Sequence, residues 1–152
     1  MTMRKWQHVN TDQLNNPRKS SIRGVDVTVY FGQDDMPAGV RGGFNPERNR
    51  FVIEFDYQTE PEPRKVVRYD THIRLHVGRW SNRIFEIEID TVAMNVQAIR
   101  LLPQVQSVLD KLKNQPENES RMFGLDRIDN YAAASGAFEQ VLPALQAELA
   151  GA

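Results

Sequence analysis

The feature that most constrains the fold of this chain is an alternation of side chains between Val67 and Val77. The odd positions are apolar apart from one threonine, while the even positions are charged or histidine: Arg68, Asp70, His72, Arg74 and His76. Successive side chains of a β-strand point to opposite faces of its sheet, so the segment predicts a strand with one buried and one polar face. A bend at Asp70 would divide it into two shorter strands, and this alternative stays open.

Three further segments alternate in the same way and predict strands, at residues 22–31, 50–58 and 83–90. Because the turns after the strands 50–58 and 65–77 are short, we expect sequence neighbours to pair antiparallel as a meander, with strand 22–31 in the same sheet. Residues 1–20 are polar and predict an irregular N-terminal arm. Residues 32–49 contain four glycines and two prolines, which predicts a long loop.

After Asp90 the spacing of apolar residues changes from two to three and four. They fall at Val96, Ile99, Leu102, Val105, Leu109 and Leu112, and again at Phe138, Leu142, Leu145 and Leu149. This spacing predicts helices over about 95–114 and 130–149. Pro103 either kinks the first helix or lies in the first turn of a new one.

The order of these elements, strands first and helices after, predicts a single α+β domain over residues 1–152. Residues 22–90 would form an antiparallel sheet of about four strands, and residues 95–150 would form helices packed on one face of that sheet. A chain of 152 residues is long enough to bury one such core.

Composition and charge exclude several classes of function. The chain has no cysteine, which excludes disulfides, thiolate zinc sites, iron–sulfur clusters and cysteine nucleophiles. Its net charge of −1 lacks the positive excess that is typical of nucleic-acid binders. Binding of nucleic acid would have to use Arg41, Arg48, Arg50, Arg64, Arg68 and Arg79. The interleaved acidic residues argue against it. Without a secretory signal or a long apolar run, we expect a cytoplasmic protein that does not enter a membrane.

The strands 65–77 and 83–90 predict a specific register. If the turn between them is centred on Ser81, paired residue numbers sum to 162. The expected apolar pairs are then Val77–Phe85, Leu75–Ile87 and Ile73–Ile89, and the expected polar pairs are His76–Glu86, Arg74–Glu88 and His72–Asp90. A sum of 160 matches opposite charges nearly as well. Opposed charges contribute only about 0.2–1 kcal/mol each, so they help to set register more than stability.

The polar face of this predicted sheet carries our candidate ligand-binding residues: His72, Arg74, His76, Glu54, Glu86 and Glu88. In a concave site, His–Glu pairs could perform general acid/base chemistry. The alternative is a solvated surface of salt bridges. His72 and His76 would be about 13–14 Å apart along one strand, too far to share an ion. The facing basic residues would neutralise the carboxylates, so we expect neither a metal nor a cofactor.

Arg79 and Trp80 lie at the tip of the expected hairpin, where a tryptophan either folds back on the sheet or marks a contact surface. The apolar stripes of the helices could also exceed what one sheet face covers. No motif for catalysis or cofactor binding is present. We therefore expect a non-enzymatic protein–protein interaction or assembly module, a homo-oligomer or the binder of a protein partner, with Trp80 and Arg79 as candidate contacts. A small-molecule-binding protein or cofactor-free enzyme that uses the polar face is the alternative.

Overall fold

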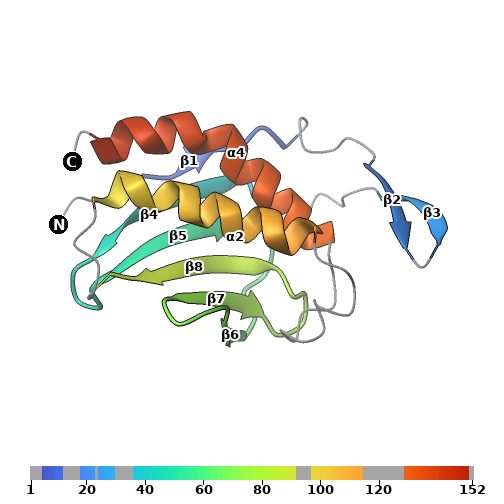
Figure 1. Cartoon of the computed structure of the whole chain (residues 1–152), viewed down its shortest axis with the longest axis horizontal. Coiled ribbons are helices and arrows are strands. Elements are labelled where there is room, and N and C mark those ends of the chain that lie inside the picture. The colour runs from blue at the N-terminus through green and yellow to red at the C-terminus, as the bar shows by residue number, and fades with distance from the viewer. Residues whose placement is uncertain are drawn as a thin grey trace.

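The computed structural model describes residues 5–11, 18–22, 24–29, 36–91, 97–114 and 129–150. Within these ranges the chain forms a six-stranded antiparallel sheet, a separate two-stranded sheet and C-terminal helices (Figure 1). Across the large sheet the strands follow the order β1 (Gln7–His8), β4 (Gly39–Asn45), β5 (Arg50–Asp56), β8 (Ile84–Asp90), β7 (Ile73–Gly78) and β6 (Arg64–Arg68). The predicted α+β class is confirmed, with more strands than expected.

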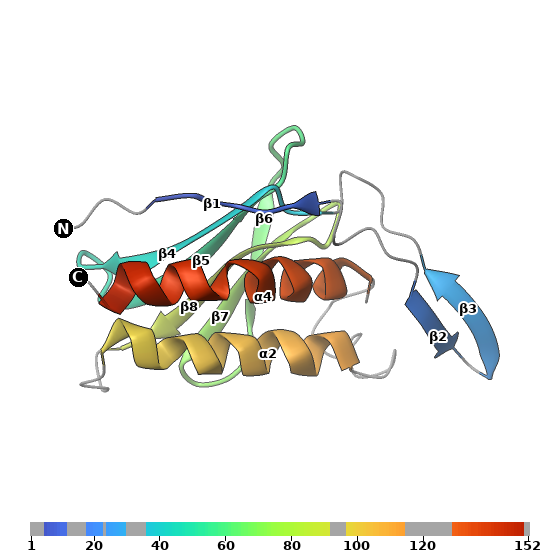
Figure 2. The same cartoon turned by 90° about the horizontal axis from the view of Figure 1, so that it is seen from above.

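The helices lie side by side on one face of this sheet (Figures 1 and 2). They are α2 (Leu102–Asn114), which follows the 3₁₀ helix η2 (Ala98–Leu101), and α4 (Asp129–Ala150). Pro103 is the second residue of α2, so it lies in the first turn of a new helix, where its missing N–H costs no hydrogen bond. No described helix is long and apolar enough to cross a membrane.

The core lies between the helices and the apolar face of the sheet. Its buried strand residues include Val40, Phe51, Ile53, Phe55, Ile73, Leu75, Val77, Ile84, Ile87 and Ile89. The helices contribute Leu102, Val105, Leu109, Leu112, Tyr131, Phe138, Val141 and Leu145. None of the exposed large apolar side chains found among the described residues belongs to a helix. The expectation that the helical stripes exceed the area of the sheet is therefore wrong for the described helices.

The alternating segment from Val67 to Val77 spans parts of two strands, β6 and β7, joined by a tight turn. Asp70 makes this turn, because its Oδ1 accepts hydrogen bonds from the N–H groups of His72 and Ile73 at 2.8 and 2.9 Å. In the β6–β7 register, odd residues face odd residues, such as Val67 opposite Leu75, and even face even. The alternation therefore stays in phase through the turn, which makes the two strands indistinguishable from one in the sequence.

The predicted register between β7 and β8 is confirmed over most of its length. Ile73 faces Ile89, Arg74 faces Glu88, Leu75 faces Ile87 and His76 faces Glu86. Beyond His76 the register shifts, and Val77 faces Ile84 rather than Phe85. Phe85 is therefore the extra residue of a β-bulge, a local irregularity that alternation alone does not reveal.

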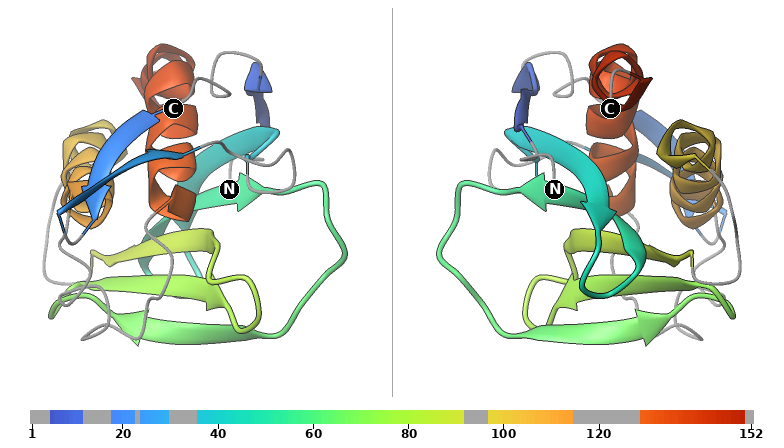
Figure 3. Two further views of the ribbon diagram at one scale, coloured as in Figure 1. Left: turned by 90° about the vertical axis from the view of Figure 1, so that its right-hand side faces the viewer. Right: turned by 90° about the vertical axis from the view of Figure 1, so that its left-hand side faces the viewer.

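The order of the strands departs from the predicted meander. β5 pairs with β8, with Phe51 opposite Ile89 and Ile53 opposite Ile87, and it does not pair with β6. Residues 57–63 instead carry the chain from β5 past two strands to the far edge of the sheet, as the arching segment in Figure 3 shows. From β6 the chain returns through β7 to β8 in consecutive antiparallel pairs. Although only residues 57–63 separate β5 from β6, these two strands are not neighbours in the sheet.

Residues 39–45, expected in a loop, form β4 in the interior of the sheet. One of the glycines that argued for a loop, Gly42, serves close packing instead. A Cβ atom on Gly42 would lie 2.6 Å from Cδ1 of Ile53 and 3.8 Å from Cδ2 of Leu145 in α4. The missing side chain therefore leaves room for the neighbouring strand and the covering helix, a role that glycine has in some strands.

The N-terminal region is more regular than predicted. β1 pairs with β4, and Val9 behind it is buried in the core. β2 (Arg18–Ile22) and β3 (Val25–Val29) form a hairpin around Gly24, whose φ is 78°. The two strands make a sheet of their own, so the prediction that strand 22–31 joins the main sheet is wrong. Residues 12–17, 23 and 30–35 lie outside the described part.

Candidate functional site

The face of the six-stranded sheet opposite the helices carries a row of charged side chains that crosses four strands. Arg41 of β4 faces Glu54 of β5, Glu54 faces Glu86 of β8, and Glu86 faces His76 of β7. The pairing of β5 with β8 thus places two carboxylates directly opposite each other. Arg41 neutralises one of them, because its Nε and Nη2 atoms donate to Oε2 of Glu54 at 2.9 and 2.7 Å.

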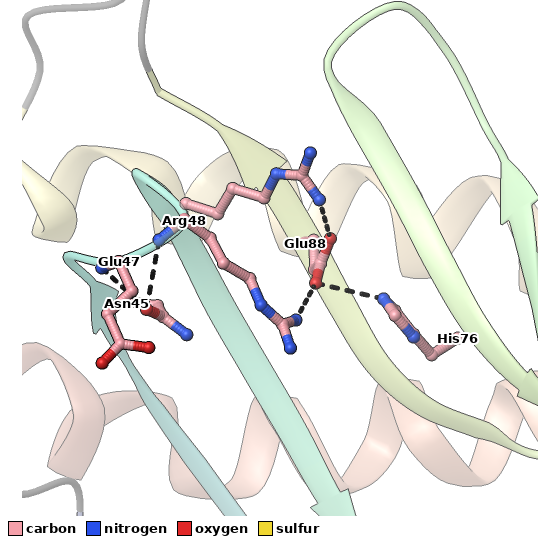
Figure 4. A network of polar contacts seen from close by, with 6 residues as sticks. Asn45, Glu47, Arg48, His76 and Glu88 are labelled. Atoms are coloured by element: carbon pink, nitrogen blue, oxygen red, sulfur yellow. Dashed lines mark hydrogen bonds and ion pairs between the residues drawn. The ribbon is translucent and has the colours of Figure 1, made fainter.

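Glu88 is the buried acid of this face, with a side chain only 2% exposed. Arg48 Nη1 donates to its Oε1 at 3.0 Å, and Arg50 Nη1 donates to its Oε2 at 2.7 Å (Figure 4). Burial raises the pKa of Glu88, but the hydrogen bond from Arg50 and the charges of His76, Arg50 and Arg48 outweigh it and hold the pKa below its ordinary value. Glu88 is therefore a buried, ionised carboxylate that is bound by the guanidinium groups of Arg48 and Arg50.

The turn between β4 and β5 delivers Arg48 to this carboxylate. Asn45 Oδ1 accepts hydrogen bonds from the N–H groups of Glu47 and Arg48 at 3.0 and 3.4 Å. Asn49 follows with a φ of 53°, a left-handed conformation that asparagine tolerates. The turn therefore closes in a fixed shape, and Arg48 reaches across to β8, as Figure 4 shows.

Glu86 and His76 are the least satisfied polar groups of this face. Glu86 is half-buried and makes no hydrogen bond or ion pair with the residues that the structure describes. Burial raises the pKa of Glu86, Glu54 and Glu88 raise it further, and His76 and Arg48 oppose them. The Nε2 atom of His76 is buried and lies 3.1 Å from Oε1 of Glu88, but outside hydrogen-bonding geometry. Both groups retain hydrogen-bonding capacity.

His76, Glu86 and Glu88 also form a group of the type that holds metal ions, since each offers a ligand atom within 4.8 Å of the others. However, both oxygens of Glu88 already accept hydrogen bonds from arginines. A divalent cation would have to share this carboxylate with two guanidinium groups. The arrangement therefore fits an internal ion-pair network better than a metal centre.

The structure thus brings four of the six predicted ligand-binding residues together, namely Glu54, His76, Glu86 and Glu88. It leaves the other two outside. His72 is exposed in the β6–β7 turn, and its carbonyl oxygen accepts a hydrogen bond from the N–H of Asp90 at 2.7 Å. Arg74 lies opposite Glu88 in the sheet but is exposed and makes no ion pair with the described residues, because Arg48 and Arg50 occupy that carboxylate.

A second candidate site is the β7–β8 turn, which carries the predicted contact residues Arg79 and Trp80. Glu62, from the segment that leads to β6, fixes its backbone. Its Oε1 accepts hydrogen bonds from the N–H groups of Trp80 and Ser81, both at 3.0 Å. Burial raises the pKa of Glu62, but these hydrogen bonds and the charge of Arg83 lower it below its ordinary value. A Cβ atom on Gly78 would lie 2.1 Å from this carboxylate oxygen, so only glycine leaves room for it.

The side chain of Trp80 projects from this fixed turn into solvent. It is 75% exposed, more than any other large apolar side chain of the described residues. The alternative that Trp80 folds back onto the sheet is therefore not what the structure adopts. Arg79 beside it is also exposed. The turn presents a large aromatic surface on a preorganised backbone.

Sequence reasoning missed the three residues that hold these sites together, Arg48, Arg50 and Glu62. Arg48 and Arg50 reach Glu88 because β5 lies beside β8, and this strand order has no local signal. Glu62 lies between two prolines, in a segment that the sequence identifies only as a connection between strands. It can bind the β7–β8 turn only because the chain passes this turn on its way to β6.

Comparison with family models, with curated proteins and with solved structures found no match for this chain. The geometry of the two sites is therefore the basis for a functional proposal.

Proposed function

We propose that this protein is a non-enzymatic protein–protein interaction module that contacts its partner through the β7–β8 turn. The observation that carries the proposal is the 75% exposure of Trp80 on a turn whose backbone Glu62 fixes. Tryptophan and arginine are among the residues enriched in interaction hot spots, and Arg79 lies next to Trp80. Because the turn is already ordered, binding would cost little backbone entropy.

The free energy gained by burying the side chain of Trp80 is large enough to dominate the affinity of an interface. Burying roughly 150–200 Å² of an indole side chain contributes about 4–5 kcal/mol at ~25 cal/mol per Å². Exposed rim contacts typically contribute less than about 1 kcal/mol each. A partner with an apolar pocket for Trp80 and an acidic or carbonyl-lined rim for Arg79 would match this turn.

Site-specific photo-crosslinking tests the proposal. A photoreactive phenylalanine analogue replaces Trp80 in one sample and Gln104, an exposed residue of α2, in a matched control. After irradiation of the cells that contain the protein, we expect a discrete crosslinked product from position 80 and none from position 104. Equal or absent crosslinking at both positions would contradict the proposal.

The mass of that product distinguishes self-association from binding of another protein. We propose that the module acts in the cytoplasm and as a homo-oligomer, which predicts a product of twice the mass of the chain. Sedimentation of the purified protein then gives an independent check, since a Trp80→Ala variant should shift toward the monomer. A product of any other mass would identify a distinct protein partner.

A ligand site on the polar face is a second candidate, and one observation favours it. Glu86 has no described partner, and the buried Nε2 atom of His76 is not hydrogen-bonded. Together they could accept a small molecule that carries an amine or several hydroxyl groups. To test this, ethanolamine and glycerol are titrated separately into the protein while the NMR signals of the His76 imidazole are recorded. Saturable changes in chemical shift that are lost in Glu86→Gln would support a site. Changes that grow linearly with concentration, or that are the same in Glu86→Gln, would contradict it.

A further inference from the structure

Strand β6 forms one edge of the six-stranded sheet, and its outer side is not paired with any strand that the structure describes. Two hydrogen bonds fix which backbone groups face outward. Arg79 N–H donates to Pro63 O at 2.8 Å, and Tyr69 N–H donates to Ile73 O at 3.0 Å. Since hydrogen-bonded pairs recur at every second residue of an antiparallel ladder, the odd residues of β6 bond to β7. The N–H and C=O groups of Arg64, Val66 and Arg68 therefore point to the free edge.

The side chains along this edge form a cationic patch that no described residue neutralises through an ion pair. Arg68 lies directly opposite Arg74, and both are exposed. Neither makes an ion pair with a described residue, and neither does Arg79 in the adjoining turn. Like charges directly opposed across a sheet are destabilising. The fold therefore retains a repulsive pair at the edge without a described counter-ion.

The other arginines of the sheet contrast with this patch. Arg41 binds Glu54, while Arg48 and Arg50 bind Glu88. These three arginines, half of the set that would serve nucleic-acid binding, are thus occupied internally. Among the described arginines of the six-stranded sheet and its turns, those without a described ion pair lie in β6, in β7 and in the turn after β7.

Apolar surface lies within the same edge. Val66 is 58% exposed on the polar face, and Val67 is partly buried against the core on the opposite face. A strand added beside β6 would extend both faces. Its side chains on the polar face would lie next to Arg64, Val66 and Arg68, and those on the helix-facing side would cover Val67.

We propose that the edge of β6 binds an extended acidic segment of a partner protein, which adds to the sheet as a seventh strand. The inference rests on the proposed interaction function and names the chemistry of a partner other than a second copy. This partner would bind β6 in addition to any self-association through the β7–β8 turn. The segment would alternate acidic and apolar residues, so that carboxylates meet the cationic patch while apolar side chains cover Val67. A second copy is not expected to pair edge to edge, because β6 would then face its own arginines. Main-chain hydrogen bonds supply affinity in this mode of recognition, and the side-chain alternation supplies specificity.

The test uses the full-length protein and a fluorescein-labelled peptide of alternating glutamate and valine, seven residues long with glutamate at both ends. We expect saturable binding by fluorescence anisotropy. Two control peptides should bind at least tenfold more weakly: one of the same composition with its valines and glutamates in separate blocks, and one with N-methyl groups on alternate amides. The first tests the alternation, and the second tests the backbone hydrogen bonds.

Two variants of the protein locate the binding site. Val66→Pro removes an outward N–H but no bond to β7, and proline is tolerated at such edge positions. Val66→Ala is its matched control. Arg68→Glu replaces a repulsive pair with an attractive one, so the fold should keep its stability. We expect Val66→Pro and Arg68→Glu to weaken peptide binding at least tenfold, with Val66→Ala close to wild type and unchanged circular dichroism throughout.

Three results would overturn the proposal: no binding of the alternating peptide at millimolar concentration, equal binding of the N-methylated peptide, or tighter binding of an oligothymidylate. The last would identify the patch as a nucleic-acid site. These outcomes are independent of crosslinking at position 80. A crosslink without peptide binding would leave the interaction function in place and refute only the acidic strand.

Discussion

Three glutamates lie on the polar face of the sheet, yet each has a different electrostatic environment. Glu54 binds Arg41, Glu88 binds two arginines, and Glu86 makes no ion pair with the described residues. The pKa of Glu88 is accordingly lowered, and the pKa of Glu86 is raised. Alternation in the sequence identifies all three as polar-face residues. Only the reach of individual arginine side chains decides which are neutralised.

Replacing Glu88 with glutamine should destabilise the protein by about 3 kcal/mol, the low end of the range for breaking a buried ion pair, because Arg48 can turn to solvent. The folded-state pKa of Glu88 lies below its unfolded value. The contribution of Glu88 to folding stability is therefore complete above its pKa in the unfolded state. It is lost as the pH falls through its lower pKa in the folded state. Urea unfolding of wild type and Glu88→Gln as a function of pH measures this. A constant difference down to acidic pH would contradict it.

Replacing Glu86 with glutamine should have the opposite effect. The pKa of Glu86 is raised in the folded state, first by burial and then by its neighbouring carboxylates. The stability gained by its protonated form is complete below the unfolded pKa and is lost as pH rises through the folded pKa. At pH 7, Glu86→Gln should therefore stabilise the protein by up to about 1 kcal/mol, the scale of opposed like charges. The gain should disappear in mildly acidic buffer, and unfolding at the two pH values checks it.

At the scale of elements, the segment before β6 and the β7–β8 turn are one unit held by a single carboxylate. Glu62 accepts hydrogen bonds from two backbone N–H groups of the turn, and its Oε2 lies 3.9 Å from Nη1 of Arg83. Its side chain is only 6% exposed, so the carboxylate that accepts these bonds is largely buried. The turn that presents Trp80 therefore depends on a residue 18 positions away in sequence.

Glu62→Ala should cost about 2 kcal/mol of stability, as for loss of a charge-assisted hydrogen-bonded group. It should also release the turn, so the amides of Trp80 and Ser81 should exchange with deuterium faster than in wild type. Gly78→Ala should give the same exchange pattern, because the new methyl group displaces the carboxylate. Glu60→Ala, an exposed position in the same segment, is the control. Unchanged exchange at Trp80 in Glu62→Ala would contradict this role.

Element types and one register follow from local patterns, while the order of the strands does not. Side-chain alternation predicts the strands β5 and β8, because it depends only on neighbouring residues. It also predicts the Arg74–Glu88 pairing, because that pairing depends on a single turn. β4 was missed because its glycines argued for a loop, and Gly42 is explained only by its contacts with Ile53 and Leu145 on other elements. The same limit applies to the candidate site, where Arg48 meets Glu88 only through the β5–β8 pairing.

At the scale of the whole molecule, the N-terminal arm closes the other edge of the sheet. β1 covers β4, and Val9 contributes to the core with an exposure of 1%. Side chains also tie the arm to α4, since Gln7 Nε2 donates to Glu148 Oε2 at 2.8 Å. A short covering strand of this kind protects a longer apolar edge from pairing with other molecules.

Removal of residues 1–10 should therefore expose β4 and cause association that increases with concentration. Val9→Ala, which keeps β1, should instead lower stability by about 2 kcal/mol without association, because it removes only buried methyl groups. Light scattering across a concentration series separates the two effects. A truncated protein that stays monomeric at every concentration would show that β1 has no protective role.

The turn between β6 and β7 constrains how this protein can diverge in evolution. Even residues face even residues across it, so Val66 and Val67 lie on their proper faces only while the pairing of β6 with β7 is kept. A slip of this pairing by one residue would turn both valines to the wrong faces, whereas a slip of two residues would restore them. We therefore expect related sequences to keep this pairing and to absorb any change of length within the turn itself.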